Sequence, residues 1–339
     1  MKQITDKKIS QKTVKKNFTT VGLILVLYVF LVMFIPYAFD YYSSQIDPVL
    51  LTDDYLYYGI YFLLLVFGTL IPFFLLRKSF GIKLKRITRR IDATFVDLFV
   101  QSIVFYTVCI ALTYVSNMIF NYFGLQGRLL SGIGLNLEYN DNILYILILL
   151  VVTPLLEEYA FRGVLLNCLS RYSKTFALYA TSLLFALAHN NFVDMIPAFG
   201  MGIVLGKTSL RYKSIQPTIV IHILFNVSIY VMSILPASII TYMAYVLVAI
   251  IVIAFALIIT GRYERISIQK SKSNAVANKL FYSRFTVILA MILMLAYTCL
   301  ITFVKLKWRI SVINFFIGCG YWIRTNEMAD SESAALPLG

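Results

Sequence analysis

The sequence predicts an all-α protein, a polytopic transmembrane helix bundle of about eight or nine membrane spans. Composition is the first reason: of 339 residues, 60% are hydrophobic and only 14% are charged, whereas about a quarter of the residues in soluble domains are charged. The second reason is that apolar runs recur along the chain, most of them near the length of about 20 residues that crosses a bilayer. The third is that Lys and Arg gather in short clusters between these runs, as in the loops of membrane proteins.

The basic character of the chain fits a membrane better than a nucleic acid. Its formal net charge is +14, but the basic clusters lie beside apolar runs, where they anchor loops to anionic lipid headgroups. We therefore expect membrane lipids as partners and no nucleic acid. The four cysteines show no Cys-x-x-Cys spacing, so we expect neither a disulfide framework nor a structural zinc cluster.

The first part of the chain contains a basic leader and three predicted spans. Residues 1–17 hold six lysines and are predicted to be cytosolic. The segment 18–141 is predicted to contain a basic loop and spans at 18–39, 55–76 and 94–123. The first span is longer than the apolar region of a signal peptide, so we expect a retained helix. The loop after it is acidic and the next loop is basic, which predicts a cytoplasmic amino terminus.

The most unusual residues lie in the segment 142–235, the predicted catalytic core. Four spans are predicted there, at 142–169, 175–189, 195–206 and 217–235. The third of these is short, and a basic turn is expected to begin at Lys207. This short third span places Ala198, Gly202 and Gly206 at four-residue spacing, a stripe of small residues that allows a neighbouring helix to approach closely.

The remaining residues form two further predicted segments. The segment 236–304 is expected to contain two C-terminal membrane helices, at 237–260 and 285–304. After it the composition turns polar and acidic, so we expect the tail, 305–339, to be disordered.

Five acidic, basic or imidazole side chains lie inside the predicted spans of the core segment. They are Glu157, Glu158, Arg162, His189 and His222. A charged group at the centre of a membrane helix costs about 2.5 to 3.5 kcal/mol on insertion scales, so such residues usually mark a functional site. The two histidines are the only ones in the chain. Their occurrence in spans close to the acidic pair predicts one buried polar cluster.

The spacing of the acidic motif predicts how its members meet. Glu158 and Arg162 are four residues apart on a helix, so they can form an ion pair. Glu157 is rotated by about 100° from Glu158 around the helix axis. We therefore expect Glu157 to be free for chemistry.

Two further pairs share a helix face at four-residue spacing. Phe185 lies one turn before His189, and Asn226 lies one turn after His222. A purely structural explanation stays open for each motif alone, because a buried ion pair can clamp helices and a lone histidine can bind a carbonyl oxygen. Phe185 and the small-residue stripe are expected to serve packing, while packing and chemistry are equally open for Asn226.

Three motifs occur in order, Glu157-Glu158-x-x-x-Arg162, Phe185-x-x-x-His189 and His222-x-x-x-Asn226. Together they resemble the motifs of the CAAX prenyl endopeptidase and bacteriocin-processing (CPBP or Abi) family, which includes lysostaphin resistance protein A. The resemblance covers residues from about 140 to 230. It implies an intramembrane metalloendopeptidase, a hydrolase that cleaves a peptide bond in a membrane-associated or lipid-modified peptide or protein.

The resemblance also implies roles for the motif residues. The catalytic residues it implies are Glu157, Glu158, Arg162, His189, His222 and Asn226. By similarity, Glu157 activates water with the help of His189, and the neighbouring carboxylate with its arginine holds the site in shape. His222 and Asn226 bind water or stabilise the oxyanion. These roles are the ones that amide hydrolysis needs, because the reaction requires an activated water, a proton donor and hydrogen-bond donors for the oxyanion.

The residues leave the presence of a metal open. Two imidazoles and one carboxylate, from His189, His222 and Glu157, match the ligand set of a catalytic Zn²⁺ with an open fourth position. The histidines are 33 positions apart, and the sequence has no His-Glu-x-x-His motif. A zinc enzyme and a metal-independent glutamate protease therefore both fit.

Other classes of function stay open as alternatives. A non-catalytic bacteriocin immunity protein or membrane scaffold would use the cluster only to hold helices together and bind a partner peptide. A transporter would use it as a proton relay, but no internal repeat of the motif region is recognisable. For the leading interpretation we expect a multi-pass protein of a bacterial cell membrane.

Overall fold

The computed structural model describes residues 10–46, 54–83, 95–123, 143–235 and 272–302, together with positions 125, 239, 249, 252–253 and 256. The chain divides into two units, Met1–Leu295 and Ala296–Gly339. All the helices that form the candidate site belong to the first unit. The predicted tail, 305–339, and most of the predicted span at 237–260 lie outside the described residues.

All regular elements within the described residues are helices, which confirms the predicted fold class. Six of these helices are long and apolar enough to cross a membrane: Gln11–Phe39, Tyr55–Ser79, Leu98–Asn121, Ile143–Leu169, Phe192–Tyr212 and Phe285–Thr302. The predicted spans at 175–189 and 217–235 correspond to two shorter apolar helices, Lys174–Leu187 and Gln216–Val231. The protein is therefore an integral membrane protein built from helices.

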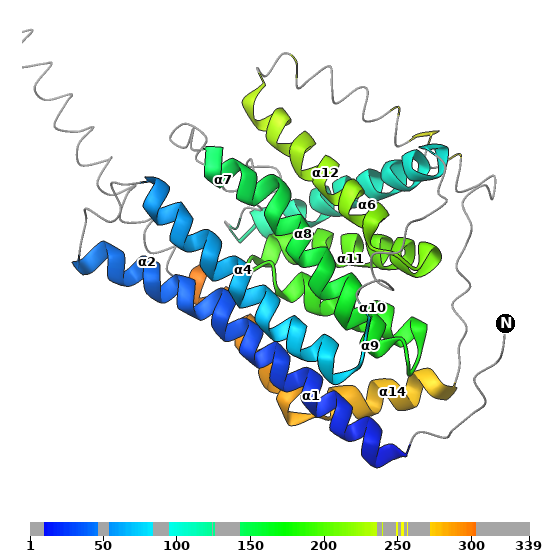
Figure 1. Cartoon of the computed structure of the whole chain (residues 1–339). Helices are drawn as coiled ribbons and strands as arrows, with labels where there is room; N and C mark the ends of the chain where they lie inside the picture. The colour runs from blue at the N-terminus through cyan, green and yellow to red at the C-terminus, as the bar shows by residue number, and fades with distance from the viewer. Residues whose placement is uncertain are drawn as a thin grey trace, which may run out of the picture. The chain divides into compact units, whose positions relative to one another are not determined.

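Turns of π-helix divide two of the spans into shorter elements. The first span consists of α1 (Gln11–Val29), the π-helical η1 (Phe30–Phe34) and α2 (Ile35–Ile46). The fourth consists of α7 (Ile143–Leu147), η2 (Ile148–Val152), α8 (Thr153–Glu157), η3 (Glu158–Leu165) and α9 (Leu166–Leu169). Figure 1 labels α1 and α2 along the first of these spans and α7, α8 and α9 along the other. The other labelled helices are α4 (Asp54–Ser79), α6 (Phe95–Asn121), α10 (Lys174–Leu187), α11 (Phe192–Tyr212), α12 (Gln216–Ile234) and α14 (Lys272–Tyr282).

The first helix begins earlier than the sequence predicts. α1 starts at Gln11 rather than near residue 18. The side chain of Ser10 caps it by accepting from the amide of Thr13 at 3.2 Å, and lysine, which recurs in its first turns, is a good helix former. Part of the predicted basic leader is therefore helical.

The predicted end of the span at 195–206 is wrong. α11 continues through Lys207 to Tyr212 and ends where Lys213 adopts a left-handed conformation with φ of 52°. Lys and Arg favour helices, and their long side chains can carry the charge to water while the stem covers apolar surface. A basic cluster at the end of a span is therefore compatible with continued helix.

α11 packs against both α10 and α6. A Cβ atom added at Gly202 would lie 2.8 Å from the Cα of Ser182 on α10, and one added at Gly206 would lie 2.5 Å from Leu178 Cδ1. The backbone contact leaves no room for a side chain at Gly202, while a side chain at Gly206 would have to displace Leu178. The close helix packing predicted from the small-residue stripe is confirmed.

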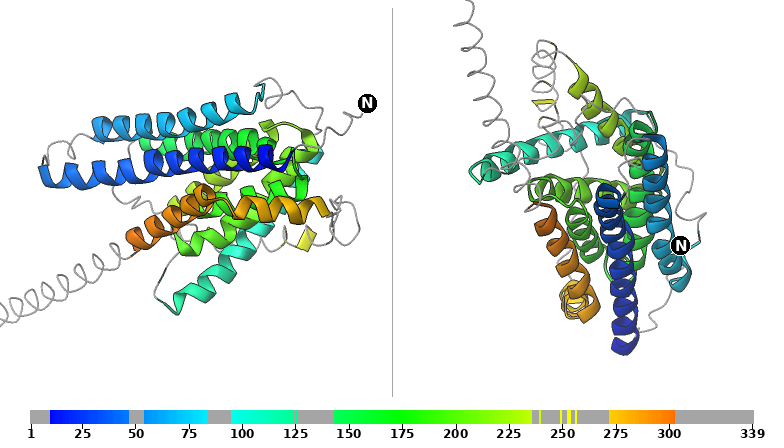
Figure 2. Two further views of the ribbon diagram at one scale, coloured as in Figure 1. Left: turned by 90° about the horizontal axis from the view of Figure 1, so that it is seen from below. Right: turned by 90° about the vertical axis from the view of Figure 1, so that its left-hand side faces the viewer.

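The pair formed by α1 and α4 packs against the motif-bearing span, and the two helices lie side by side (Figure 2). Phe161 on η3 contacts Tyr28 of α1 and Phe73 of α4, with ring centres 6.2 and 6.0 Å apart. Phe161 also contacts Phe185 of α10, at 5.2 Å. These buried rings hold η3 against both the α1 and α4 pair and α10, and so position the acidic motif.

Candidate active site

The acidic motif lies at the junction of an α-helical and a π-helical segment. Glu157 ends α8 and Glu158 begins η3, while the earlier π-turn, η2, ends just before Pro154. Proline has no amide hydrogen with which to continue the helical ladder, so a local change in hydrogen bonding around it is expected. π-turns are rare and frequently occur at functional sites.

Glu158 is the centre of the cluster. Arg162 Nη1 donates to Glu158 Oε1 across 2.8 Å, and His222 Nδ1 lies 3.0 Å from the same oxygen. All three side chains are buried, with Glu158 completely inaccessible. The ion pair that the spacing predicts is present, and α12 brings His222 to it.

The orientation of His222 leaves its second ring nitrogen facing Glu157. The Glu158 oxygen already accepts from Arg162, so it is an acceptor and Nδ1 of His222 carries the hydrogen. His222 Nε2 lies 3.8 Å from Glu157 Oε2, a separation at which a shared water is the natural bridge. The side chain of Glu157 is 26% exposed, against 0% for Glu158. Glu157 is therefore the carboxylate that water and a substrate can reach.

Phe185 links Arg162 with both histidines. The guanidinium carbon of Arg162 lies 4.0 Å from the centre of the Phe185 ring, a cation–π contact. The ring centres of His189 and His222 lie 4.6 and 6.3 Å from the centre of that ring. The distance between the two imidazole centres therefore cannot exceed the sum of these two distances. The packing role expected for Phe185 is thus accompanied by a direct contact with the ion pair.

His189 lies outside its helix, contrary to the predicted span. α10 ends at Leu187, and Asn190 follows the histidine with φ of 55°, a left-handed conformation that turns the chain toward α11. His189 Nδ1 lies 2.8 Å from the carbonyl oxygen of Phe185. Because a carbonyl can only accept, Nδ1 carries the hydrogen and the neutral ring has its lone pair on Nε2.

Asn226 connects α12 to the motif-bearing span. Its Nδ2 donates to the carbonyl oxygen of Leu149 across 3.2 Å. Leu149 lies in η2, where a π-turn replaces the regular helical ladder. The contact fixes α12 one turn beyond His222, next to the cluster.

The sequence did not indicate two buried neighbours of the acidic pair. Thr218 lies on α12 one turn before His222, beside the Glu158 carboxylate. Tyr28 of α1 lies within electrostatic range of Glu157. A lone Thr or Tyr in an apolar run carries no signal, and only the four-residue spacing from His222 could have suggested Thr218.

Two buried polar atoms of the cluster lack a partner in the part of the chain that the structure describes. Glu158 Oε2 and Arg162 Nη2 have no hydrogen-bond partner within the described residues. Buried atoms of this kind commonly bind an ordered water. The site is therefore suited to holding water beside the carboxylates.

The donor geometry does not provide a three-ligand metal centre. In the described part of the chain, no group of three or more His, Cys, Asp and Glu side chains could hold a metal ion. His222 Nε2 and Glu157 face each other, but His189 is joined to them through the Phe185 ring. The guanidinium of Arg162 beside Glu158 further disfavours a divalent cation there. The zinc ligand set of Glu157, His189 and His222 stays a prediction.

The fold and the site together define a class of protein, a polytopic helical membrane protein whose core buries a Glu-Glu-x-x-x-Arg motif against an imidazole from another helix. Residues 139–228 match the family model described as type II CAAX prenyl endopeptidase Rce1-like. The resemblance expected from the three motifs is thereby confirmed for the segment that carries them.

A particular relative is the membrane-embedded CAAX protease MroQ of Staphylococcus aureus strain USA300, which is 36% identical over 90 residues. The match covers 24% of this chain and 36% of the relative. The chain thus matches about a third of the length of that curated protein. No solved structure matches the chain.

Proposed function

We propose that the protein is an intramembrane endopeptidase of the CAAX-protease type. The observation that carries the proposal is the contrast between two neighbouring carboxylates. Glu158 is locked by Arg162 and His222, whereas Glu157 is partly exposed and faces Nε2 of the same histidine. The match of residues 139–228 to a CAAX prenyl endopeptidase model supports peptide-bond hydrolysis as the reaction.

In the proposed reaction, a water molecule lies between Glu157 Oε2 and His222 Nε2. Glu157 takes one proton from this water while the water oxygen attacks the carbonyl carbon of the scissile bond. The proton is then delivered to the amide nitrogen, the C–N bond breaks, and a carboxylic acid and an amine are released. Glu157 returns to its starting state.

The other residues support this step. Glu158 and Arg162 hold the imidazole of His222 so that Nε2 faces the water. His189 assists proton transfer through its own Nε2. Asn226 uses one amide hydrogen on Leu149 and offers the second to the negative charge that develops on the carbonyl oxygen, while His222 binds the attacking water through Nε2.

The substrate we propose is a membrane-associated or lipid-modified peptide or protein that reaches the site from within the bilayer. The distribution of Lys and Arg supports a cytoplasmic amino terminus, and the location we propose is a bacterial cell membrane. The alternative is a non-catalytic bacteriocin immunity or scaffold protein. That function would need the buried ion pair but not an exposed Glu157.

Cleavage by the purified full chain tests the proposal. The protein in lipid nanodiscs is given internally quenched peptides, with and without a C-terminal prenylated cysteine, and the Glu157→Gln variant is compared with wild type. Removal of a general base is expected to lower the rate by at least about 100-fold. Tyr159→Phe is the matched control, because this residue lies on the same helix but faces Arg77.

Two results would contradict the proposal. One is equal cleavage by wild type and by a Glu157→Gln variant that elutes as a monodisperse, folded species. The other is peptide binding without cleavage by wild type, which favours the scaffold alternative. Retained cleavage by Tyr159→Phe shows that loss in the other variant arises at the site.

A further inference from the structure

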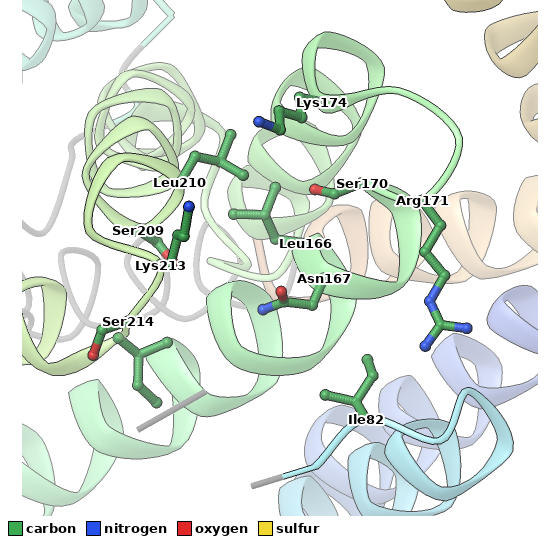
Figure 3. A pocket seen from close by; sticks show the side chains of 11 residues that line it. Ile82, Leu166, Asn167, Ser170, Arg171, Lys174, Ser209, Leu210, Lys213 and Ser214 are labelled. Atoms are coloured by element: carbon green, nitrogen blue, oxygen red, sulfur yellow. The ribbon is translucent and has the colours of Figure 1, made fainter. Parts of the chain in front are cut away.

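A polar cavity lies where several helices end, and none of the residues of the acidic cluster lines it (Figure 3). Its volume is about 290 Å³, close to the lower end of the range of about 300 to 1,000 Å³ for ligand sites. The turn after α4, the end of α9 and the starts of α10 and α12 contribute to it, together with the end of α11. It therefore lies at the boundary of the membrane-spanning segments rather than at their centre.

Cations and hydroxyl groups dominate the lining of this cavity. Its described basic and hydroxyl-bearing residues are Arg171, Lys174, Lys213, Ser170, Ser209 and Ser214. No Asp or Glu is among the described lining residues, and the sequence contains none between positions 159 and 193 or between 195 and 263. The positive charge at the cavity is thus not neutralised by acids in the same stretch of chain.

Two helices begin at the cavity and add to its positive potential. Lys174 is the first residue of α10, and Ile215 is the N-cap of α12. Neither helix has an acidic residue in its first turn. Helix N-termini carry partial positive charge and attract anions. The helix ends and the lysines therefore favour the same kind of ligand.

The cavity also offers an unsatisfied donor and a fixed cation. Ser170 Oγ is buried and has no hydrogen-bond partner in the described part of the chain. Arg171 is held in place, because its Nη2 donates to the carbonyl oxygen of Phe80 and its guanidinium lies 5.4 Å from the Phe80 ring centre. In the view of Figure 3, Lys213 and Arg171 border the cavity on opposite sides. Basic side chains around one cavity, together with a hydroxyl donor, suit an oxyanion with several acceptor atoms.

We propose that this cavity binds a phosphate group, with the headgroup of an anionic phospholipid as its source. Basic pockets between membrane helices at the headgroup level are the usual sites for such lipids. Inorganic phosphate offers the same acceptor atoms, so the two sources are separated by experiment. The site is distinct from the proposed peptidase centre and does not depend on peptidase activity.

The test is binding of a fluorescent short-chain phosphatidylglycerol to the full chain in a neutral detergent, with phosphatidylcholine of equal chain length for comparison. The double variant Lys174→Gln with Lys213→Gln removes two cavity cations. The matched control is Lys12→Gln with Lys16→Gln, which removes two exposed charges on α1. The cavity variant is expected to bind phosphatidylglycerol about 30-fold more weakly, and the control less than about 2-fold more weakly.

A second variant addresses the hydroxyl donor without changing net charge. Ser170→Ala is expected to weaken phosphatidylglycerol binding by about 5-fold at an unchanged melting temperature. Direct titration with inorganic phosphate in the absence of lipid, at constant ionic strength set with chloride, gives the affinity for the free anion. Phosphate binding as tight as phosphatidylglycerol binding assigns free phosphate as the source, and clearly weaker phosphate binding assigns the lipid headgroup.

The proposal is overturned if the cavity and control variants weaken binding equally, because the attraction would then be diffuse. It is also overturned if wild type binds phosphatidylglycerol and phosphatidylcholine with the same affinity and shows no binding of inorganic phosphate. Selective loss in the cavity variant, with the control unaffected, supports the site.

Discussion

Arg162 and Glu158 form an ion pair within one π-helical segment, with 2.8 Å between the guanidinium nitrogen and the carboxylate oxygen. The pair compensates two charges that the membrane interior disfavours. The same carboxylate oxygen also orients His222. Glu157, the next residue, stays outside this pair. Structural and chemical roles can therefore be separated by substitution.

Arg162→Gln is expected to destabilise the protein by about 3 to 5 kcal/mol, because the buried Glu158 carboxylate loses its compensating charge. The free energy of unfolding is measured in detergent by denaturant titration. Lys15→Gln, an exposed change on α1, serves as control and should stay within about 0.5 kcal/mol of wild type. A loss below about 1 kcal/mol for Arg162→Gln would show that the pair is not a main source of stability.

Substitutions of the two carboxylates are expected to lower the free energy of unfolding by different amounts. Glu158→Gln should lower the free energy of unfolding by about 3 kcal/mol or more, since Arg162 is left buried without a counter-charge. Glu157→Gln should change it by less than about 1 kcal/mol, because that side chain is partly exposed. Thermal unfolding of both variants in the same detergent provides the comparison. Equal losses in the two variants would contradict the division of roles.

Phe185→Leu removes the ring that faces the Arg162 guanidinium and both imidazoles. The lost cation–π contact is expected to cost about 1 to 2 kcal/mol of stability, and the cleavage rate should fall at nearly constant KM. Phe176→Leu on the same helix is the control, since Phe176 packs on Phe18 and Phe281 instead. That control should lose stability but keep the rate per folded molecule. A similar fall in rate for both variants would argue against a specific role for Phe185.

Gly202→Ala is expected to destabilise the protein by about 1 to 3 kcal/mol, because its Cβ would clash with the backbone of Ser182. Gly59→Ala is the control on another membrane helix, where an added Cβ meets nothing within 4 Å. It should leave stability unchanged or raise it by up to about 1 kcal/mol. Thermal unfolding checks both. An unaffected Gly202→Ala protein would mean that α10 and α11 can separate at little cost.

Chelation is expected to leave cleavage within about 2-fold of the untreated rate, because the described residues offer no three-ligand centre. The peptide assay is repeated after incubation with 1,10-phenanthroline and with its non-chelating isomer as control. Loss of activity with the chelator alone, restored by Zn²⁺, would contradict this expectation. In that case His189 must move toward Glu157 and His222.

Features that depend on local spacing or on composition could be predicted from the sequence. Apolar runs of membrane length predicted the helical bundle, and the four-residue interval predicted the contact of Glu158 with Arg162. Helix ends were less predictable: a Ser10 cap extends α1, and the left-handed Lys213 ends α11 later than its basic residues suggested. The end of α10 before His189 depends on the turn at Asn190, which periodicity does not reveal.

By itself the sequence determined that the chain is a bundle of membrane helices, and it predicted that Glu158, Arg162 and His222 lie in one cluster, because charge inside a membrane must be compensated. Glu157 and Glu158 are chemically identical, and the four-residue interval to Arg162 already distinguishes Glu158 from Glu157 in the sequence. Tertiary structure decided that His222 of α12 contacts Glu158 through one ring nitrogen and faces Glu157 with the other, and that the Phe185 ring covers Arg162. These contacts join helices far apart in the sequence, so no local pattern encodes them.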